Sequence, residues 1–153
     1  MKPRFTYIFT LSLLMSFLVG VVMSITMMLR NGQPLEPVSL LANIGLATAI
    51  GLVVMLIFPV ARGGEALALF YGAEPGKLAF GLLQSVVIAT AMTFCVSFGM
   101  VAVGTGFFEL PDGSTFIVRW LEPIWDVWGI AYLATILGLP VATWVANKAF
   151  GQK

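Results

Sequence analysis

Four long apolar stretches constrain this chain more than any other feature of its sequence. They cover residues 5–29, 38–61, 78–103 and 124–147. A helix needs about 20 predominantly apolar residues to cross the hydrocarbon core of a bilayer. Only 10% of the 153 residues are charged, whereas soluble domains carry about 25%. The sequence therefore predicts an all-α integral membrane protein. Its four helices should form a bundle that is in contact with the lipid bilayer.

The first apolar stretch follows Lys2 and Arg4, as the core of a secretory signal peptide would. Such a core is about 7–15 residues long, and this stretch is longer. We therefore expect it to be retained as the first span.

Turn-forming residues separate the four spans. Asn31-Gly32 marks the end of the first span, and Pro37 and Pro123 suit the first turns of the second and fourth. Pro140 lies inside the fourth span, where it should kink the helix or leave a carbonyl group that a neighbour must satisfy.

Two connections have a mixed composition. Residues 65–77 combine apolar, aromatic and charged side chains, so we expect them in the headgroup region. The connection over residues 104–123 is the longest. After Ser114, residues 115–122 form either a short interfacial helix capped by that serine or an irregular loop.

The distribution of lysine and arginine predicts the orientation of the spans, because cytoplasmic loops carry an excess of both. Six of the eight fall on one side of the predicted bundle, namely Lys2, Arg4, Arg62, Lys77, Lys148 and Lys153. Arg30 and Arg119 fall on the other side. This split predicts a multi-pass protein with both termini in the cytoplasm.

Small residues recur at every fourth position along the first and third spans. They are Ser12, Ser16, Gly20 and Ser24 in the first span and Gly81, Ser85, Ala89, Thr93 and Ser97 in the third. This spacing places each set on one face of a helix, and small residues allow helices to approach closely in a bilayer. We predict that both stripes mediate helix packing, and that Gly20 and Ala89 form one of the closest backbone approaches.

The two halves of the chain resemble each other. At an offset of 69 residues, Leu13-Leu14-Met15-Ser16 falls on Leu82-Leu83-Gln84-Ser85, and Met23-Ser24 falls on Met92-Thr93. We therefore predict two hairpins of two helices each, over residues 1–72 and 73–153. Because two spans return the chain to the same side, the halves should be parallel, with a pseudo-two-fold axis along the membrane normal.

These motifs resemble a family of small bacterial membrane modules, domain-of-unknown-function family 2798. The resemblance implies a two-helix hairpin with a Leu-Leu-x-Ser…Met-Ser/Thr first helix, and a second helix with early tryptophans and a late Ala…Pro element. The second half fits through Leu82-Leu83-Gln84-Ser85, Met92-Thr93, Trp120, Trp128, Ala131 and Pro140. The first half fits less completely, because it lacks every tryptophan. The resemblance implies a tandem pair in the bacterial inner (cytoplasmic) membrane and no specific activity.

Asp126 is the candidate ion site of this sequence. Ionisable residues inside a membrane are costly and therefore often functional, and Asp126 lies about one turn into the fourth span. One interpretation is a cation or proton site at the mouth of the bundle. The other, which we favour, is a carboxylate near a helix N-terminus, where the helix dipole stabilises it.

The remaining polar and sulfur-containing residues point to packing. Asn43 and Gln84 are expected to form hydrogen bonds between helices, and Cys95 is expected to behave as a small apolar residue. The methionines Met23, Met27 and Met28 suggest core filling more than a copper(I) path. The chain has no histidine and one cysteine, so the usual ligand sets of zinc and iron–sulfur sites are absent.

Two functions remain open. The first is a non-enzymatic membrane protein that acts through helix contacts, as a homo-oligomer or as an accessory subunit of a membrane-protein complex. The second is a small transporter or channel with a path between the two hairpins. We favour the first, because transporters place polar groups near the midplane and the middle turns here hold no charged residue. The sequence contains no recognisable catalytic pair, cofactor motif or nucleic-acid-binding pattern.

Overall fold

The computed structural model describes the backbone of residues 2–150 and the side chains of residues 6–149. Over these residues all regular secondary structure is helical, which confirms the predicted all-α class. The elements are α1 (Lys2–Arg30), α2 (Pro37–Ile57), α3 (Val60–Phe70), α4 (Leu78–Thr105), α5 (Phe116–Leu121) and α6 (Ile124–Phe150).

Four segments are long and apolar enough to cross a membrane, judged by length and composition. They are Thr6–Arg30, Pro37–Ile57, Leu78–Thr105 and Phe116–Ala149. Together they identify a multi-pass membrane protein, as the sequence predicted.

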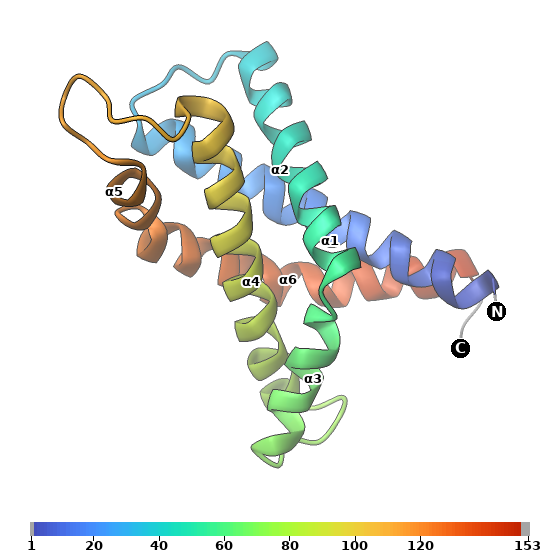
Figure 1. Cartoon of the computed structure of the whole chain (residues 1–153). Coiled ribbons are helices and arrows are strands. Elements are labelled where there is room, and N and C mark those ends of the chain that lie inside the picture. The colour runs from blue at the N-terminus through green and yellow to red at the C-terminus, as the bar shows by residue number, and fades with distance from the viewer. Residues whose placement is uncertain (1, 151–153) are drawn as a thin grey trace.

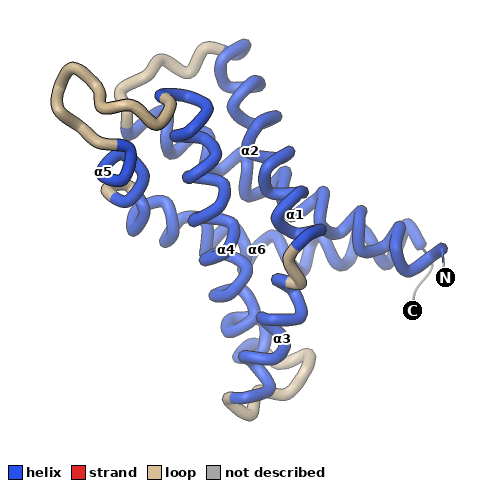
Figure 2. Tube along the Cα trace, viewed as in Figure 1, coloured by secondary structure: helices blue, strands red, loops and turns tan. Residues whose placement is uncertain are grey.

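The long helices form a ring around a shared core (Figure 1). Helix α1 packs against α2 and α6, and α4 packs against α6, α3 and α2. Helices α1 and α4 therefore occupy diagonal positions. Figure 2 shows that the loops after α1 and after α4 lie at one end of the molecule. At the opposite end, α1 and α6 run together toward the termini, and α3 and α4 diverge from them toward the turn at residues 71–77.

The second predicted span is broken into α2 and α3. The break is at Phe58-Pro59, where the backbone leaves the helical conformation (ψ 132° and 54°). Because proline lacks an N–H group, it cannot continue the hydrogen-bond ladder of α2. Helix α3 then packs along the first half of α4. The sequence had placed residues 65–77 in the headgroup region and had not predicted this helix.

The connection between α4 and α6 contains the short interfacial helix that the sequence left open. Helix α5 spans Phe116–Leu121, and its N-cap residue is Thr115. The expectation that Ser114 caps it is wrong, because the Ser114 hydroxyl donates instead to the Asp112 carboxylate at 2.7 Å. Short local hydrogen bonds of this kind are an alternative to capping.

Large apolar side chains fill the centre of the ring. Val19 and Met23 of α1 and Ile88, Met92 and Val96 of α4 are at most 2% exposed. They belong to one continuous cluster with residues of α2, α3 and α6. The two buried methionines suit this position, because their flexible chains fill irregular gaps.

Both stripes of small residues lie largely inside the bundle. Gly20, Ala89 and six of the other residues are buried, and only Gly81 is half-exposed. The prediction that Gly20 and Ala89 form one of the closest backbone approaches is wrong, because α1 and α4 are diagonal in the ring. Gly20 faces α2 instead, where an added Cβ would lie 3.2 Å from the Thr48 backbone nitrogen.

A close approach of two helix backbones occurs where α3 packs against α4. A Cβ at Gly64 would lie 2.8 Å from the Gln84 carbonyl oxygen and 3.1 Å from the Gln84 Cα. These atoms belong to a backbone that cannot move aside. At the adjacent Gly63, an added Cβ would meet the Val87 Cγ1 at an ordinary 3.6 Å.

We predict that Gly64→Ala destabilises the protein and that Gly63→Ala does not. Overpacking at Gly64 should lower the free energy of unfolding by about 1–3 kcal/mol. Gly63→Ala should be neutral or stabilising by up to about 1 kcal/mol, because alanine favours helix. Thermal unfolding in detergent measures both. Equal effects of the two substitutions would show that α3 does not pack on α4 in this register.

Candidate functional site

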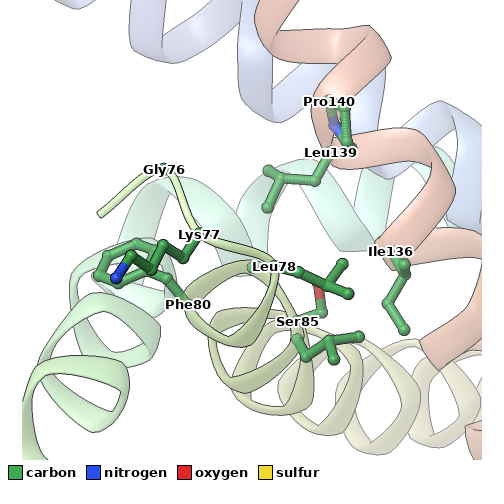
Figure 3. Close-up of a pocket in the computed structure, with 10 residues that line it drawn as sticks. Gly76, Lys77, Leu78, Phe80, Ser85, Ile136, Leu139 and Pro140 are labelled. Carbon is green, nitrogen blue, oxygen red and sulfur yellow. The ribbon is translucent and has the colours of Figure 1, made fainter. Parts of the chain in front are cut away.

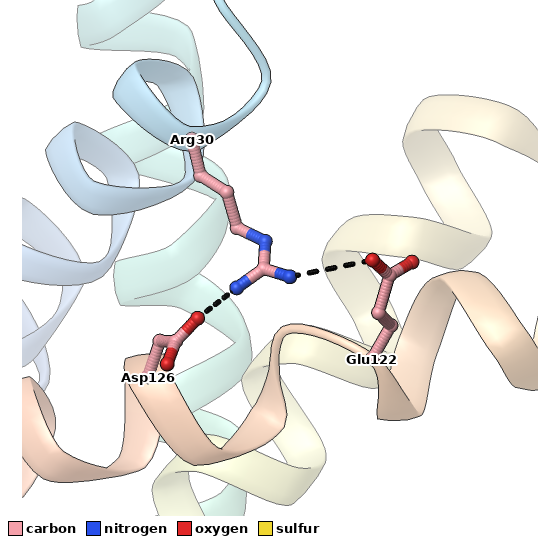
Figure 4. Close-up of polar contacts among 3 residues, drawn as sticks. All are labelled: Arg30, Glu122 and Asp126. Atoms are coloured by element: carbon pink, nitrogen blue, oxygen red, sulfur yellow. Dashed lines mark hydrogen bonds and ion pairs between the residues drawn. The ribbon is translucent and has the colours of Figure 1, made fainter.

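Charged groups gather at the end of the bundle where α1 ends and α6 begins. The Arg30 guanidinium, at the last residue of α1, forms an ion pair with Asp126 in the first turn of α6 (Figure 4). A second nitrogen of Arg30 lies 3.5 Å from a carboxylate oxygen of Glu122. One arginine thus bridges two carboxylates across the α1–α6 contact.

This cluster changes the interpretation of Asp126. Its side chain is 67% exposed, and its charge is compensated by Arg30. The sequence had offered an ion site or an interaction with the helix dipole, and had not paired Asp126 with Arg30. The arrangement can fasten the ends of two helices together, and the exposed pair contributes about 0.2–1 kcal/mol to stability.

Arg119 of α5 organises the loop between α4 and α5. Its guanidinium donates hydrogen bonds to the carbonyl oxygens of Gly106, Phe108 and Ser114 and to the Thr105 hydroxyl, at 2.5–3.2 Å. In the same loop, hydrogen bonds from the Ser114 hydroxyl and N–H lower the pKa of Asp112. The arginine therefore closes the loop on itself. Its guanidinium is engaged in four hydrogen bonds within the loop and is not directed at a ligand site.

A row of aromatic side chains ties α5 and α6 to α4. The indole N–H of Trp120 donates to the Ser97 hydroxyl at 3.1 Å, and that of Trp128 donates to the Thr90 hydroxyl at 3.0 Å. The Tyr132 ring stacks on Trp128 with a centroid distance of 5.3 Å. Buried or half-buried indoles commonly find such partners, so this row is structural.

A cleft of about 270 Å³ separates the first turns of α4 from the second half of α6 (Figure 3). Its walls include Leu78, Leu82, Ile136, Leu139 and Pro140. The only charged side chain among its lining residues is that of Lys77. Lys77 is exposed and pairs with Glu74 at 2.8 Å. The cleft is therefore an apolar binding space with a polar rim.

Several hydroxyl groups inside the bundle have no hydrogen-bond partner. They are those of Ser16, Ser24, Thr48, Ser85 and Thr93. Among these, only Ser85 lines the cleft. Other hydroxyls of the spans donate to the carbonyl four residues earlier, as those of Thr26, Thr90 and Thr135 do.

The other sequence candidates lie in packing positions. Asn43, Gln84 and Cys95 are half-buried, and among the described side chains neither Asn43 nor Gln84 forms the interhelical hydrogen bond that was expected. Gln84 instead packs its Cγ against Gly64. Met23 and Met28 are buried. Over the part of the chain that the structure describes, no three His, Cys, Asp or Glu residues are grouped as metal ligands.

Comparison of the chain with family models, curated proteins and solved structures found no match. The resemblance to family 2798 and the internal repeat therefore remain predictions.

We predict that Asp126→Asn weakens the bundle slightly. Loss of the pair with Arg30 should lower the free energy of unfolding by about 0.2–1 kcal/mol at low salt, and the difference should shrink at high salt through screening. The control is Glu65→Gln, which neutralises an exposed carboxylate on a different helix, α3. A cation that binds the wild type and is lost with Asp126→Asn would instead support an ion site.

Proposed function

We propose that this chain is a non-enzymatic protein of the bacterial inner membrane that acts through contacts between helices. It serves as a homo-oligomer or as an accessory subunit of a membrane-protein complex. The proposal is supported by the outward face of α2, which is the least covered of the long helices. Only 17% of its apolar window is buried, against 39% for α1 and for α4.

The exposed face of α2 carries small residues at helical spacing. Ala42, Gly45 and Ala49 are all exposed, and a Cβ at Gly45 would meet nothing within 4 Å. A glycine inside a helix costs about 0.8–1.0 kcal/mol relative to alanine, and packing within this chain does not compensate that cost at Gly45. Membrane helices commonly associate through flat faces of small residues. A second membrane helix is therefore the proposed partner of this face.

The alternative, transport through a path between the two hairpins, has less support. The space between them holds Val19, Ile88 and Met92, all at most 1% exposed. These side chains would have to move apart to open a path for a polar solute.

We further propose that both termini face the cytoplasm, on the basis of the six-to-two distribution of lysine and arginine. The turn at residues 71–77 belongs to the same side, and it carries Lys77. Arg30 and Arg119 lie on the other, outer side.

Reporter fusions test this orientation. Fusions after Lys153 and within the turn at residues 72–76 should report a cytoplasmic location, and fusions near Asp112 a periplasmic one. The physical reason is the cost of moving positively charged loops across the membrane. A periplasmic signal from the C-terminal fusion would overturn the proposed orientation.

Cysteine cross-linking in native membranes tests the proposed contact of α2. In a Cys95→Ala background, which lacks other cysteines, Gly45→Cys should form a disulfide-linked dimer or a cross-link to another protein. Leu133→Cys is the matched control, because it is exposed on α6. Both sites lie eight or nine residues after the start of their helices, at a depth of about 12–14 Å.

Mass spectrometry of the cross-linked product separates the two forms of the proposal. A product containing only this chain indicates a homo-oligomer, and a second polypeptide indicates an accessory role. If Gly45→Cys cross-links no more efficiently than Leu133→Cys, the outward face of α2 contacts lipid and the proposed function loses its support.

A further inference from the structure

The cleft between α4 and α6 has an unusual polar feature at its floor. Ser85 is 1% exposed, lines the cleft, and its hydroxyl has no hydrogen-bond partner. Figure 3 shows Ser85 on α4 close to Leu78, with Ile136 on the facing helix α6. A buried hydroxyl without a partner costs about 1–3 kcal/mol, so a group that hydrogen-bonds to it would be bound favourably.

Other serine and threonine hydroxyls of α4 donate to the backbone carbonyl four residues earlier in the same helix. Thr90 donates to the Val86 carbonyl at 2.7 Å, Ser97 to the Thr93 carbonyl at 2.5 Å and Thr105 to the Val101 carbonyl at 3.0 Å. Ser85 does not make the corresponding bond to Gly81. Its hydroxyl therefore lacks the partner within α4 that these other side chains have.

The opposite wall carries a second group without its usual partner. In a helix, the carbonyl of Ile136 would accept a hydrogen bond from the N–H of residue 140. Residue 140 is Pro140, which lies inside α6 and has no N–H. Ile136 and Pro140 are four residues apart on one face of α6, and both line the cleft. The Ile136 carbonyl, on a residue that lines the cleft, therefore lacks the donor that residue 140 supplies in a regular helix.

We propose that this cleft binds a neutral apolar molecule that carries one hydroxyl group, an aliphatic or phenolic alcohol dissolved in the membrane. Its hydroxyl accepts a hydrogen bond from Ser85 and donates one to the Ile136 carbonyl. Its apolar part lies against Leu78, Leu82 and Leu139. This site is separate from the α2 face and does not depend on the proposed function.

The size and charge of the cleft fit this class of ligand. An apolar cavity of about 150 Å³ accommodates one benzene molecule, so 270 Å³ accommodates a substituted ring or a short alkyl chain. The only cation among the lining residues, Lys77, is 66% exposed and already paired with Glu74. A charged head group is therefore not required for binding.

A pair of fluorinated probes of equal size tests the proposal. 4-(Trifluoromethyl)phenol carries the hydroxyl, and 4-(trifluoromethyl)toluene replaces it with a methyl group. Binding to the full chain in lipid nanodiscs is measured by titration with fluorine NMR. Each probe is compared between variants, because its partition into the lipid is then the same in every sample.

Three variants separate the contributions of the cleft. Ser85→Ala removes the hydroxyl at the floor. Gly81→Leu places a bulky side chain at the cleft, because Gly81 lines it and an added Cβ there meets nothing within 4 Å. Ser24→Ala is the matched control, because the Ser24 hydroxyl is equally buried and also without a partner, but Ser24 is not among the lining residues of the cleft.

The wild type should bind the phenol saturably. Ser85→Ala should weaken that binding about fivefold, as expected for one lost hydrogen bond, and leave binding of the toluene within about twofold. Gly81→Leu should abolish binding of both probes, and Ser24→Ala should change neither. The proposal is overturned by any of three results: no saturable binding of the phenol, equal loss of both probes in Ser85→Ala, or unchanged binding in Gly81→Leu.

Discussion

The close approach of helix backbones is the condition on which this structure depends. Lipid is as apolar as a leucine side chain, so helices in a bilayer gain little by burying apolar surface against each other. Van der Waals contact must supply the association, and it needs surfaces that fit. Gly64 meets the Gln84 backbone, Gly20 meets Thr48, and Gly51 lies against Ser16 and the Met92 methyl group. These glycines join α3 to α4 and α1 to α2 and connect both contacts to the core.

Polar contacts complete the end of the bundle where the two long loops lie. Arg30 connects α1 to α6, Arg119 closes the loop after α4, and Trp120 and Trp128 donate from α5 and α6 to α4. At the opposite end, α1 and α6 separate from α3 and α4 (Figure 1). The cleft lies on this side of the molecule, between α4 and α6.

Much of the fold was accessible from sequence because apolar length and turn chemistry act locally. The four spans and the inward-facing stripes follow from periodicity and composition, whereas the short helix after residue 114 was left open. The partner of Gly20 did not follow from either, because a stripe of small residues defines a contact surface without specifying which helix covers it. The same limit applies to Asp126. Its position near the start of a helix could be predicted from the sequence, but its pairing with Arg30, 96 residues away in the chain, could not.

The sequence by itself determined the class of protein, the number of spans and the positions where the chain turns, since each depends on residues close together in the chain. Tertiary structure alone decided the order of the helices around the ring, the packing of residues 60–70 on α4, and the cleft. Ser85 and Pro140 illustrate the difference. Their separate properties, a small hydroxyl and a missing N–H, are fixed by residue type, but only the packing of α4 against α6 brings them to opposite walls of one space.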